Sequence, residues 1–386
     1  MASAAAYRPA TVAATRGIAG GATAGDAPRM RPSVRGRILC TRPAPAGRTW
    51  TTTRGLGISV RTGDEKAYAE VARCVDAPSF IVPWLDRFYD ADEVRLLLAT
   101  AGGTEVGSFS PQMLARAVRR AVLDRGPDGG YRPSSFHKRY EMWALFEGYE
   151  DVPSEVRRAL NEWELADYLL GVGPGIQALR DVGLDGGDQS DYTFLLLPEA
   201  EEMLRALPRI YLWPCNCRAM WGNCSRPHGV CLRFENDRDL GWELGPARAV
   251  EILRQADAAG LMHTAYTNSR HGHHGICNCC ADCCFPILAA ERLGATDLWP
   301  VRRHVAAVDP EACNGCRRCL RRCPFGALSM INGVDSVPRL DAKACRGCGL
   351  CSTGCPQDAI AMQPLPAHGG LKARRPSAQR APAADM

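Results

Sequence analysis

The sequence lacks several features that would place it in a common class of protein. It contains no hydrophobic run of about 18 residues, which argues against a membrane-spanning helix. The apolar core of a secretory signal is also missing from its N-terminus. No Gly-x-Gly-x-x-Gly fingerprint follows a predicted strand, which disfavours a Rossmann-type nucleotide site and an NAD-dependent enzyme. A flavin or corrinoid bound without a motif stays open as an alternative.

Cysteine, in contrast, is abundant, with 19 cysteines among the 386 residues. They lie in three tight blocks (residues 215–231, 277–284 and 313–355), and only Cys40 and Cys74 lie outside. Tight blocks favour metal ligation over a network of disulfides. Because no secretory signal precedes them, they also predict a reducing, cytoplasmic location.

The last block contains one four-cysteine pattern twice. Both runs, which begin at Cys313 and Cys345, have the spacing Cys-x2-Cys-x2-Cys-x3-Cys-Pro. A lone Cys-x2-Cys pair is more often a zinc site, but two complete runs with trailing prolines favour iron–sulfur ligation. Residues 301–365 closely resemble the two-cluster bacterial ferredoxins, in which the fourth cysteine of each run binds the other cluster. The resemblance implies two 4Fe–4S clusters, the first bound by Cys313, Cys316, Cys319 and Cys355 and the second by Cys345, Cys348, Cys351 and Cys323.

A second repeat, outside the cysteines, supports the same domain. Residues 324–328 and 356–360 share the pattern Pro-x-x-Ala-Leu/Ile. Two similar halves predict a small domain of hairpins and short helices with the clusters at its core. Because about 60 residues bury only a small core, we expect bound clusters to contribute to its folding free energy.

Residues 211–300 contain more cysteine than core packing requires. Asn216 and Asn278 each lie inside a Cys-x-Cys, so the two blocks look like facing halves of one site. We predict a third metal centre there, iron–sulfur or zinc, with ligands from the first block or from both. A redox-active pair of adjacent thiols is the alternative. The candidate ligands are Cys215, Cys217, Cys224, Cys231, Cys277, Cys279, Cys280, Cys283 and Cys284, and the interpretation of His271, His273 and His274 as ligands or as an exposed loop stays open.

The order of these blocks carries a second resemblance. A Cys-x-Cys-Arg block, then Ile-Cys-Asn-Cys-Cys, then a two-cluster ferredoxin is similar to a bacterial and archaeal group of ferredoxin-domain proteins. That resemblance implies an architecture rather than a reaction.

Residues 63–210 are predicted to be mainly helical. A helix is expected over residues 92–99, and another begins with Ser110 as its N-cap and Pro111 in its first position and continues to Gly126. A glycine-rich turn at residues 126–131 and an extended return follow, which suggests a winged-helix-like module. Such a module reads DNA or serves as a platform for a partner. Its basic residues are few and also suit a helix end, so we expect no nucleic acid; they are Arg116, Arg119, Arg120 and Arg125.

The two ends of the chain carry most of its basic charge. Residues 1–62 are rich in Arg, Ala and Thr, with Asp26 as the sole acid before residue 61. An organelle transit peptide has this composition, but we favour a disordered extension or an upstream start because no amphipathic helix is evident. Residues 366–386 are predicted to be a disordered tail. The body between the tails is mildly acidic, which weakens any argument for nucleic-acid binding from the net charge of +5.

The sequence therefore predicts an α+β protein with a leader (1–62), a mainly helical domain (63–210), a cysteine-rich α/β domain (211–300), a ferredoxin domain (301–365) and a tail (366–386). The favoured function is an electron-transfer protein or oxidoreductase subunit that serves a redox partner protein. A stand-alone reductase with its active centre in residues 211–300, and a redox-sensing DNA-binding regulator, are the alternatives. The arginines among the predicted cluster ligands would raise the reduction potential or dock an acidic partner; they are Arg317, Arg318, Arg321, Arg322 and Arg346.

Overall fold

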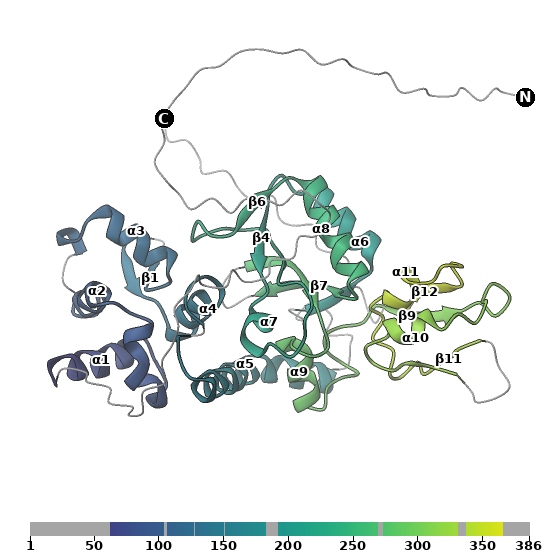
Figure 1. Cartoon of the computed structure of the whole chain (residues 1–386), viewed down its shortest axis with the longest axis horizontal. Coiled ribbons are helices and arrows are strands. Elements are labelled where there is room, and N and C mark those ends of the chain that lie inside the picture. Colours follow the sequence, from purple (N-terminus) through teal and green to yellow (C-terminus); the bar gives the residue numbers. More distant parts are fainter. Residues whose placement is uncertain are drawn as a thin grey trace, which may run out of the picture. The chain divides into compact units, whose positions relative to one another are not determined.

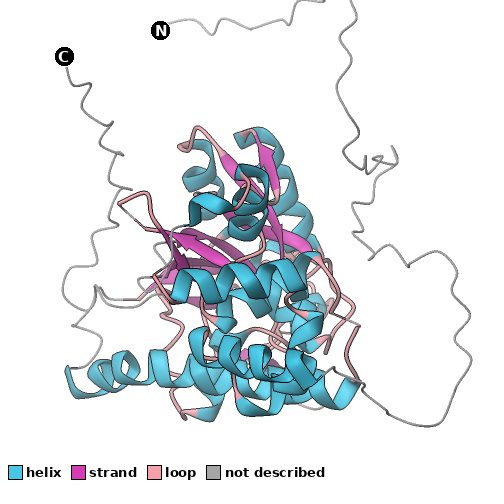
Figure 2. Cartoon of the chain, turned by 90° about the vertical axis from the view of Figure 1, so that its left-hand side faces the viewer, coloured by secondary structure: helices cyan, strands magenta, loops and turns pink. Residues whose placement is uncertain are grey.

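The computed structural model describes residues 62–365, except 104–105, 127, 150, 183–191, 269–272 and 331–336. The predicted leader, apart from Thr62, and the predicted tail lie outside this part of the chain. Helices and strands both contribute to the fold, which confirms the predicted α+β class (Figure 2). No helix within the described ranges is long and apolar enough to cross a membrane. The cytoplasmic location stays a prediction.

The first described region is mainly helical, as predicted. Its order is α1 (Thr62–Cys74), η1 (Ser79–Arg87), α2 (Ala91–Ala101), η2 (Val106–Ser108), α3 (Pro111–Arg119), β1 (Leu123–Arg125), β2 (Tyr131–Pro133), α4 (Phe136–Phe146) and α5 (Ser154–Val182) (Figure 1). Asp90 begins α2 with a capping box, in which its carboxylate accepts hydrogen bonds from the backbone N–H groups of Asp92 and Glu93. Ser110 caps α3 by accepting from the Met113 N–H, as the sequence predicted.

The glycine-rich turn joins an antiparallel hairpin, in which Leu123 of β1 pairs with Pro133 of β2. A helix followed by two extended segments agrees with the predicted order, and the winged-helix-like interpretation stays a prediction. The helix that we expected to continue toward Gly126 ends at Arg119 instead, because the backbone turns at Ala121 with a φ of 56°. Leu123 is therefore a buried residue of strand β1 and not of a helix.

A six-stranded antiparallel sheet forms the next region. Its strands lie in the order β3 (Tyr192–Leu195), β7 (Met262–Asn268), β8 (His273–Cys279), β5 (Gly229–Arg233), β4 (Ile210–Pro214) and β6 (Trp242–Leu244). The predicted domain boundary at residue 210 would assign β3 to the helical domain. Strand pairing instead places β3 at the edge of this sheet, with Phe194 opposite Thr264 of β7.

Two helices that contact each other, α6 (Leu197–Arg205) and α8 (Pro246–Ala258), cover part of this sheet (Figure 1). Leu204 of α6 and Leu253 of α8 share a core with Leu232 and Ile276 of the central strands. Two shorter helices, α7 (Asn216–Trp221) and α9 (Phe285–Arg292), both contact α5. The cysteine-rich segments lie at the ends of β4 and β8, within β5, and at the starts of α7 and α9.

The C-terminal region is built from two similar halves. Its elements are β9 (His304–Val308), α10 (Arg318–Arg322), β10 (Leu328–Ser329), β11 (Arg339–Leu340), α11 (Leu350–Thr353) and β12 (Ile360–Pro364). β9 pairs antiparallel with β12, and β10 pairs antiparallel with β11. The same type of turn precedes each cysteine run, starting at Asp309 and at Asp341. In each turn the aspartate carboxylate accepts hydrogen bonds from the backbone N–H groups two and three residues later. The sequence repeat is therefore also a repeat of local structure.

Candidate metal sites

Two hollows in the C-terminal region are each lined by four cysteines. The first has Val308, Pro338 and Ile360 among its apolar walls, and its cysteines are Cys313, Cys316, Cys319 and Cys355. The second has Phe325, Leu328 and Met362 among its walls, and its cysteines are Cys323, Cys345, Cys348 and Cys351. Each hollow thus combines three cysteines of one run with the fourth cysteine of the other run.

The donors in these hollows suit an iron–sulfur cluster. Four thiols converge on one small apolar space, and a backbone N–H, that of Ala327, donates to the Cys323 Sγ at 3.3 Å. Burial raises the pKa of Cys348 and of Cys351 to about 12, so metal binding there must displace protons. The first hollow is nearer to solvent, because Cys316 is exposed.

Six of the nine cysteines between residues 215 and 284 form a closed ring of interacting thiols, which we call the six-cysteine ring. In order around the ring they are Cys215, Cys217, Cys284, Cys279, Cys277 and Cys231, and the last is next to the first. β8 contributes two members two residues apart, which places both on one face of the strand. The neighbouring strand β5 contributes Cys231, and the starts of α7 and α9 contribute the other three.

Interaction within the ring separates the acidities of its thiols. Neighbouring thiols lower the pKa of Cys215 and of Cys279 well below the ordinary value. The same interactions raise the pKa of the other four members. Further donors reach the ring from outside, since the Phe285 N–H donates to the Cys217 Sγ at 3.5 Å and the Thr264 hydroxyl lies 3.3 Å from the Cys279 Sγ. Such contacts to sulfur are a known means of tuning a metal–thiolate centre.

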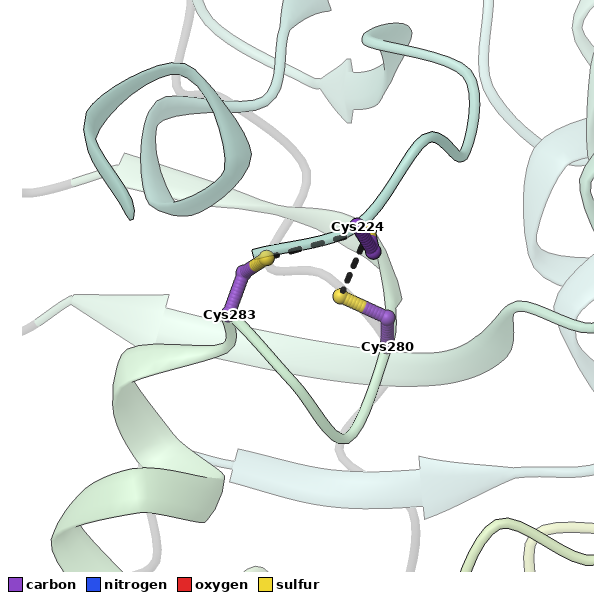
Figure 3. Close-up of side chains that lie close together, drawn as sticks. All are labelled: Cys224, Cys280 and Cys283. Atoms are coloured by element: carbon purple, nitrogen blue, oxygen red, sulfur yellow. Dashed lines mark hydrogen bonds between the residues drawn. The ribbon is translucent and has the colours of Figure 1, made fainter. Parts of the chain in front are cut away.

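The other three cysteines, Cys224, Cys280 and Cys283, form a separate group that we call the three-cysteine site (Figure 3). The Cys224 Sγ lies 3.7 Å from the Cys280 Sγ and 3.7 Å from the Cys283 Sγ. Cys224 follows α7, and the other two lie in the turn between β8 and α9. Cys283 lowers the pKa of Cys280 to about 6, and the guanidinium of Arg218 acts in the same direction.

Arg218 is a buried cation that reaches both cysteine groups, and its position in the sequence did not predict this role. It is 1% exposed, and its Nη2 donates to the Asn278 carbonyl at 2.9 Å. Its Nε and Nη1 have no hydrogen-bond acceptor in the described part of the chain. Burial alone would lower the pKa of Arg218, but the thiols of Cys215, Cys280 and Cys231 outweigh burial and raise it. A buried cation of this kind requires negative charge nearby, which thiolates supply.

The two cysteine blocks pack against each other in one buried region, within which their thiols interact as two groups. The adjacent pairs Cys279–Cys280 and Cys283–Cys284 are split between the groups, which disfavours the alternative of a redox pair of adjacent thiols. No disulfide occurs among the described cysteines. His274 is exposed on β8, whereas His271 and the side chain of His273 lie outside the described residues. The choice between histidine ligands and an exposed loop stays open.

Direct contacts join the C-terminal region to the six-cysteine ring. Cys279 and Cys284 of the ring share a buried apolar cluster with Leu350, and Phe325 and Cys348 pack against that cluster. The ring of Phe325 also lies edge-on to that of Phe194, with centroids 6.4 Å apart.

Polar contacts fix the same junction. Nη2 of Arg322 donates to both the carboxylate and the backbone carbonyl of Asp257 at 2.9 Å, and the Thr353 hydroxyl donates to that carboxylate at 2.9 Å. Asp257 belongs to α8, whereas Arg322 lies between two of the predicted cluster ligands. The sequence offered no signal for this anchor, because it depends on contacts between distant segments.

Comparison with known proteins identifies one part of the chain. Residues 304–362 match the family model described as a 4Fe–4S dicluster domain. No curated protein and no solved structure matches the chain significantly. Residues 304–362 therefore form a 4Fe–4S dicluster domain, which confirms the resemblance to two-cluster ferredoxins and gives the chain an iron–sulfur, electron-carrying role.

Proposed function

We propose that this chain is an electron-transfer protein or oxidoreductase subunit in which the dicluster domain exchanges single electrons with a third metal centre in the six-cysteine ring. The observation that carries the proposal is the buried cluster in which Cys348 packs beside Cys279 and Cys284. A cluster ligand and two ring cysteines thus share one apolar environment. Iron–sulfur clusters supply one-electron chemistry, with a potential tuned by hydrogen bonds to sulfur and by solvent access.

The ligand sets in this proposal are those of the two hollows and the ring. Cys313, Cys316, Cys319 and Cys355 would hold the first cluster, and Cys323, Cys345, Cys348 and Cys351 the second. The ring offers six thiols, more than the four that one tetrahedral ion accepts. Its size and its burial beside the second hollow favour an iron–sulfur centre over a structural zinc ion.

The two hollows differ in a way that suggests a direction for electron exchange with a partner. Cys316 of the first hollow is exposed, and Arg317, Arg318 and Arg321 beside it are exposed as well. The second hollow faces the ring through Cys348. An acidic redox protein would therefore dock at the first hollow, where exposed cations steer association. Of the other two arginines, Arg322 is engaged by Asp257 and Arg346 lies over Phe325 at 5.7 Å.

The alternative of a DNA-binding regulator receives less support, because acids and an aromatic ring in the same chain engage the basic residues of the winged-helix-like region. Arg116 pairs with Asp90 at 2.7 Å, and Arg119 pairs with Asp239 at 2.7 Å. Arg120 pairs with Glu93 at 2.8 Å, and the Arg125 guanidinium lies over the Tyr131 ring at 5.8 Å. These partners compete with phosphate, which favours a platform for protein contacts over a nucleic-acid reader.

Iron counting with spectroscopy tests the proposal. The anaerobically purified chain should contain about eight irons in the dicluster domain and further irons in the ring. Changing Cys231 and Cys284 to serine together should remove only the further irons and their EPR signal. Stopped-flow reduction should then show fewer electrons accepted per chain, with the dicluster signals retained. An iron content of about eight in the wild type, unchanged in the double variant, would overturn the proposal.

A further inference from the structure

The thiols of the three-cysteine site are packed at the spacing of one tetrahedral metal ion. Two of their sulfur–sulfur distances are 3.7 Å, and all three sulfurs lie within 4.8 Å of one another (Figure 3). Zn–S bonds of about 2.3 Å at tetrahedral angles separate two sulfurs by about 3.8 Å. The site therefore matches a single ion with little rearrangement.

The other cysteine sites do not share this spacing. In the part of the chain that the structure describes, Cys224, Cys280 and Cys283 are the one group of potential ligands whose atoms approach so closely. Thiolates that hold a cubane each bind a different iron and must stand farther apart. Among the described residues, neither the hollows of the dicluster domain nor the six-cysteine ring offers three thiols that are all within 4.8 Å of one another, so a single ion fits the three-cysteine site best.

We propose that the three-cysteine site binds a single thiophilic divalent ion, Zn²⁺, through three protein thiolates, and that its fourth position is open to an exogenous thiol. Metal sites with four protein ligands are closed and structural, whereas sites with three protein ligands keep a position for solvent or substrate. A soft, thiolate-rich ion favours a soft fourth ligand, which is why a small thiol is the expected class.

The charge around the site fits this occupant. Zn²⁺ with three thiolates carries one net negative charge. That charge would attract the positively charged, buried guanidinium of Arg218. Arg218 is 1% exposed, and its Nε and Nη1 have no hydrogen-bond acceptor within the described residues. A metal-bound thiolate can accept a hydrogen bond, so binding of the ion would place acceptors near these two donors.

A small molecule can approach the site from solvent. Cys224 is partly exposed, and its neighbours Asn223 and Ser225 are exposed. Asp282, next to Cys283, is exposed as well, and its carbonyl accepts a hydrogen bond from the Asn223 side chain at 2.9 Å. This bond ties the two cysteine-bearing loops together, which holds the three thiols at fixed spacing. Cys280 and Cys283 themselves are buried.

This site is independent of the proposed electron transfer, because zinc has no redox chemistry in proteins. The decisive comparison is between Cys224→Ser and Cys74→Ser, since Cys74 is a partly buried cysteine of α1 outside both groups. Zinc and iron are counted per chain in the anaerobically purified full-length protein. We expect about one zinc in the wild type and in Cys74→Ser, its loss in Cys224→Ser, and the same iron content in all three. An unchanged zinc content in Cys224→Ser, or a loss of iron with it, would overturn the proposal.

The wild-type protein alone supplies a second test, so the proposal does not depend on the folding of a variant. Zinc-edge X-ray absorption should report about three sulfurs at about 2.3 Å and one lighter ligand. Addition of 2-mercaptoethanol should replace the lighter ligand with a fourth sulfur. Four sulfur ligands before the thiol is added would show a closed site and contradict the proposal. A zinc edge that does not change when the thiol is added would also contradict it.

Discussion

Cys279 and Cys280 are neighbours in the chain, yet Cys279 joins the six-cysteine ring and Cys280 joins the three-cysteine site. β8 ends at Cys279, and successive side chains of extended backbone point in opposite directions, so one dipeptide supplies both sites. Arg218 interacts with members of both groups and so links them electrostatically. The structure thus places a ring of six thiols beside a three-cysteine site whose Cys224 is partly exposed.

Gly347→Ala should disrupt the second hollow. Gly347 has a φ of 68°, and a Cβ there would lie 2.2 Å from the His304 carbonyl oxygen. We expect a loss of about 3 kcal/mol or more in unfolding free energy, because left-handed strain adds to a backbone clash. Gly326→Ala is the matched control, since its φ is 63° but a Cβ there would meet nothing within 4 Å. It should cost about 1 kcal/mol. Denaturant unfolding and iron counts report both variants, and equal costs would contradict the argument.

The ion pair between Arg322 and Asp257 should contribute more to the unfolding free energy than an ordinary surface ion pair does. The side chains of Arg322 and Asp257 are only 20% and 10% exposed. We expect Asp257→Asn to lower the unfolding free energy by about 1–3 kcal/mol, because it leaves a partly buried guanidinium with a weaker partner. It should also slow electron exchange between the dicluster domain and the ring, measured by stopped-flow.

Glu251→Gln is the matched control on the same helix. Glu251 pairs with Arg248, and both side chains are well exposed, so its removal should cost less than about 1 kcal/mol. Electron exchange should stay at the wild-type rate. If the two variants lose equal stability and exchange electrons equally fast, the anchor has no special role.

The unfolding free energy should depend on pH through His137. Its Nδ1 lies 3.1 Å from the Glu164 carboxylate. Burial opposes the protonated form, but Glu164 and nearby acids outweigh it and raise the pKa of His137 to about 9. Between about pH 6.5 and pH 9 the folded chain therefore keeps this proton, whereas the unfolded chain, with a histidine pKa of about 6.5, has lost it. The stabilisation is complete below pH 6.5 and disappears as pH rises through about 9.

His137→Gln removes this contribution while keeping a polar side chain. The variant should be less stable than the wild type at pH 6, and the gap should shrink toward pH 9.5. Guanidinium unfolding followed by far-UV circular dichroism measures the gap at each pH. A gap that stays constant across this range would contradict the assignment to His137.

Local signals in the sequence predicted a large part of this molecule, and long-range ones did not. Ser110 and Pro111 predicted the start of α3, and the repeated cysteine spacing predicted the dicluster domain, because both depend on residues close together in the chain. β3 was assigned to the helical region because its pairing with β7 spans distant segments. The division of the cysteines was missed for a related reason: it depends on where β8 ends relative to Cys279. Neither composition nor residue spacing predicted the contact between Arg322 and Asp257.

Docking of a redox partner should depend on the exposed arginines beside the first hollow. Arg317 and Arg321 are exposed, whereas Arg322 is engaged by Asp257, so the neighbours divide into partner-facing and internal roles. Changing Arg317 and Arg321 to glutamine together should slow electron exchange with an acidic ferredoxin-type partner by about tenfold or more at low salt. The rate should also lose much of its dependence on ionic strength, because screening acts on the charges that were removed. Midpoint potentials measured on the same variant separate docking from tuning: shifted potentials with an unchanged salt dependence would assign these arginines to the clusters rather than to the partner.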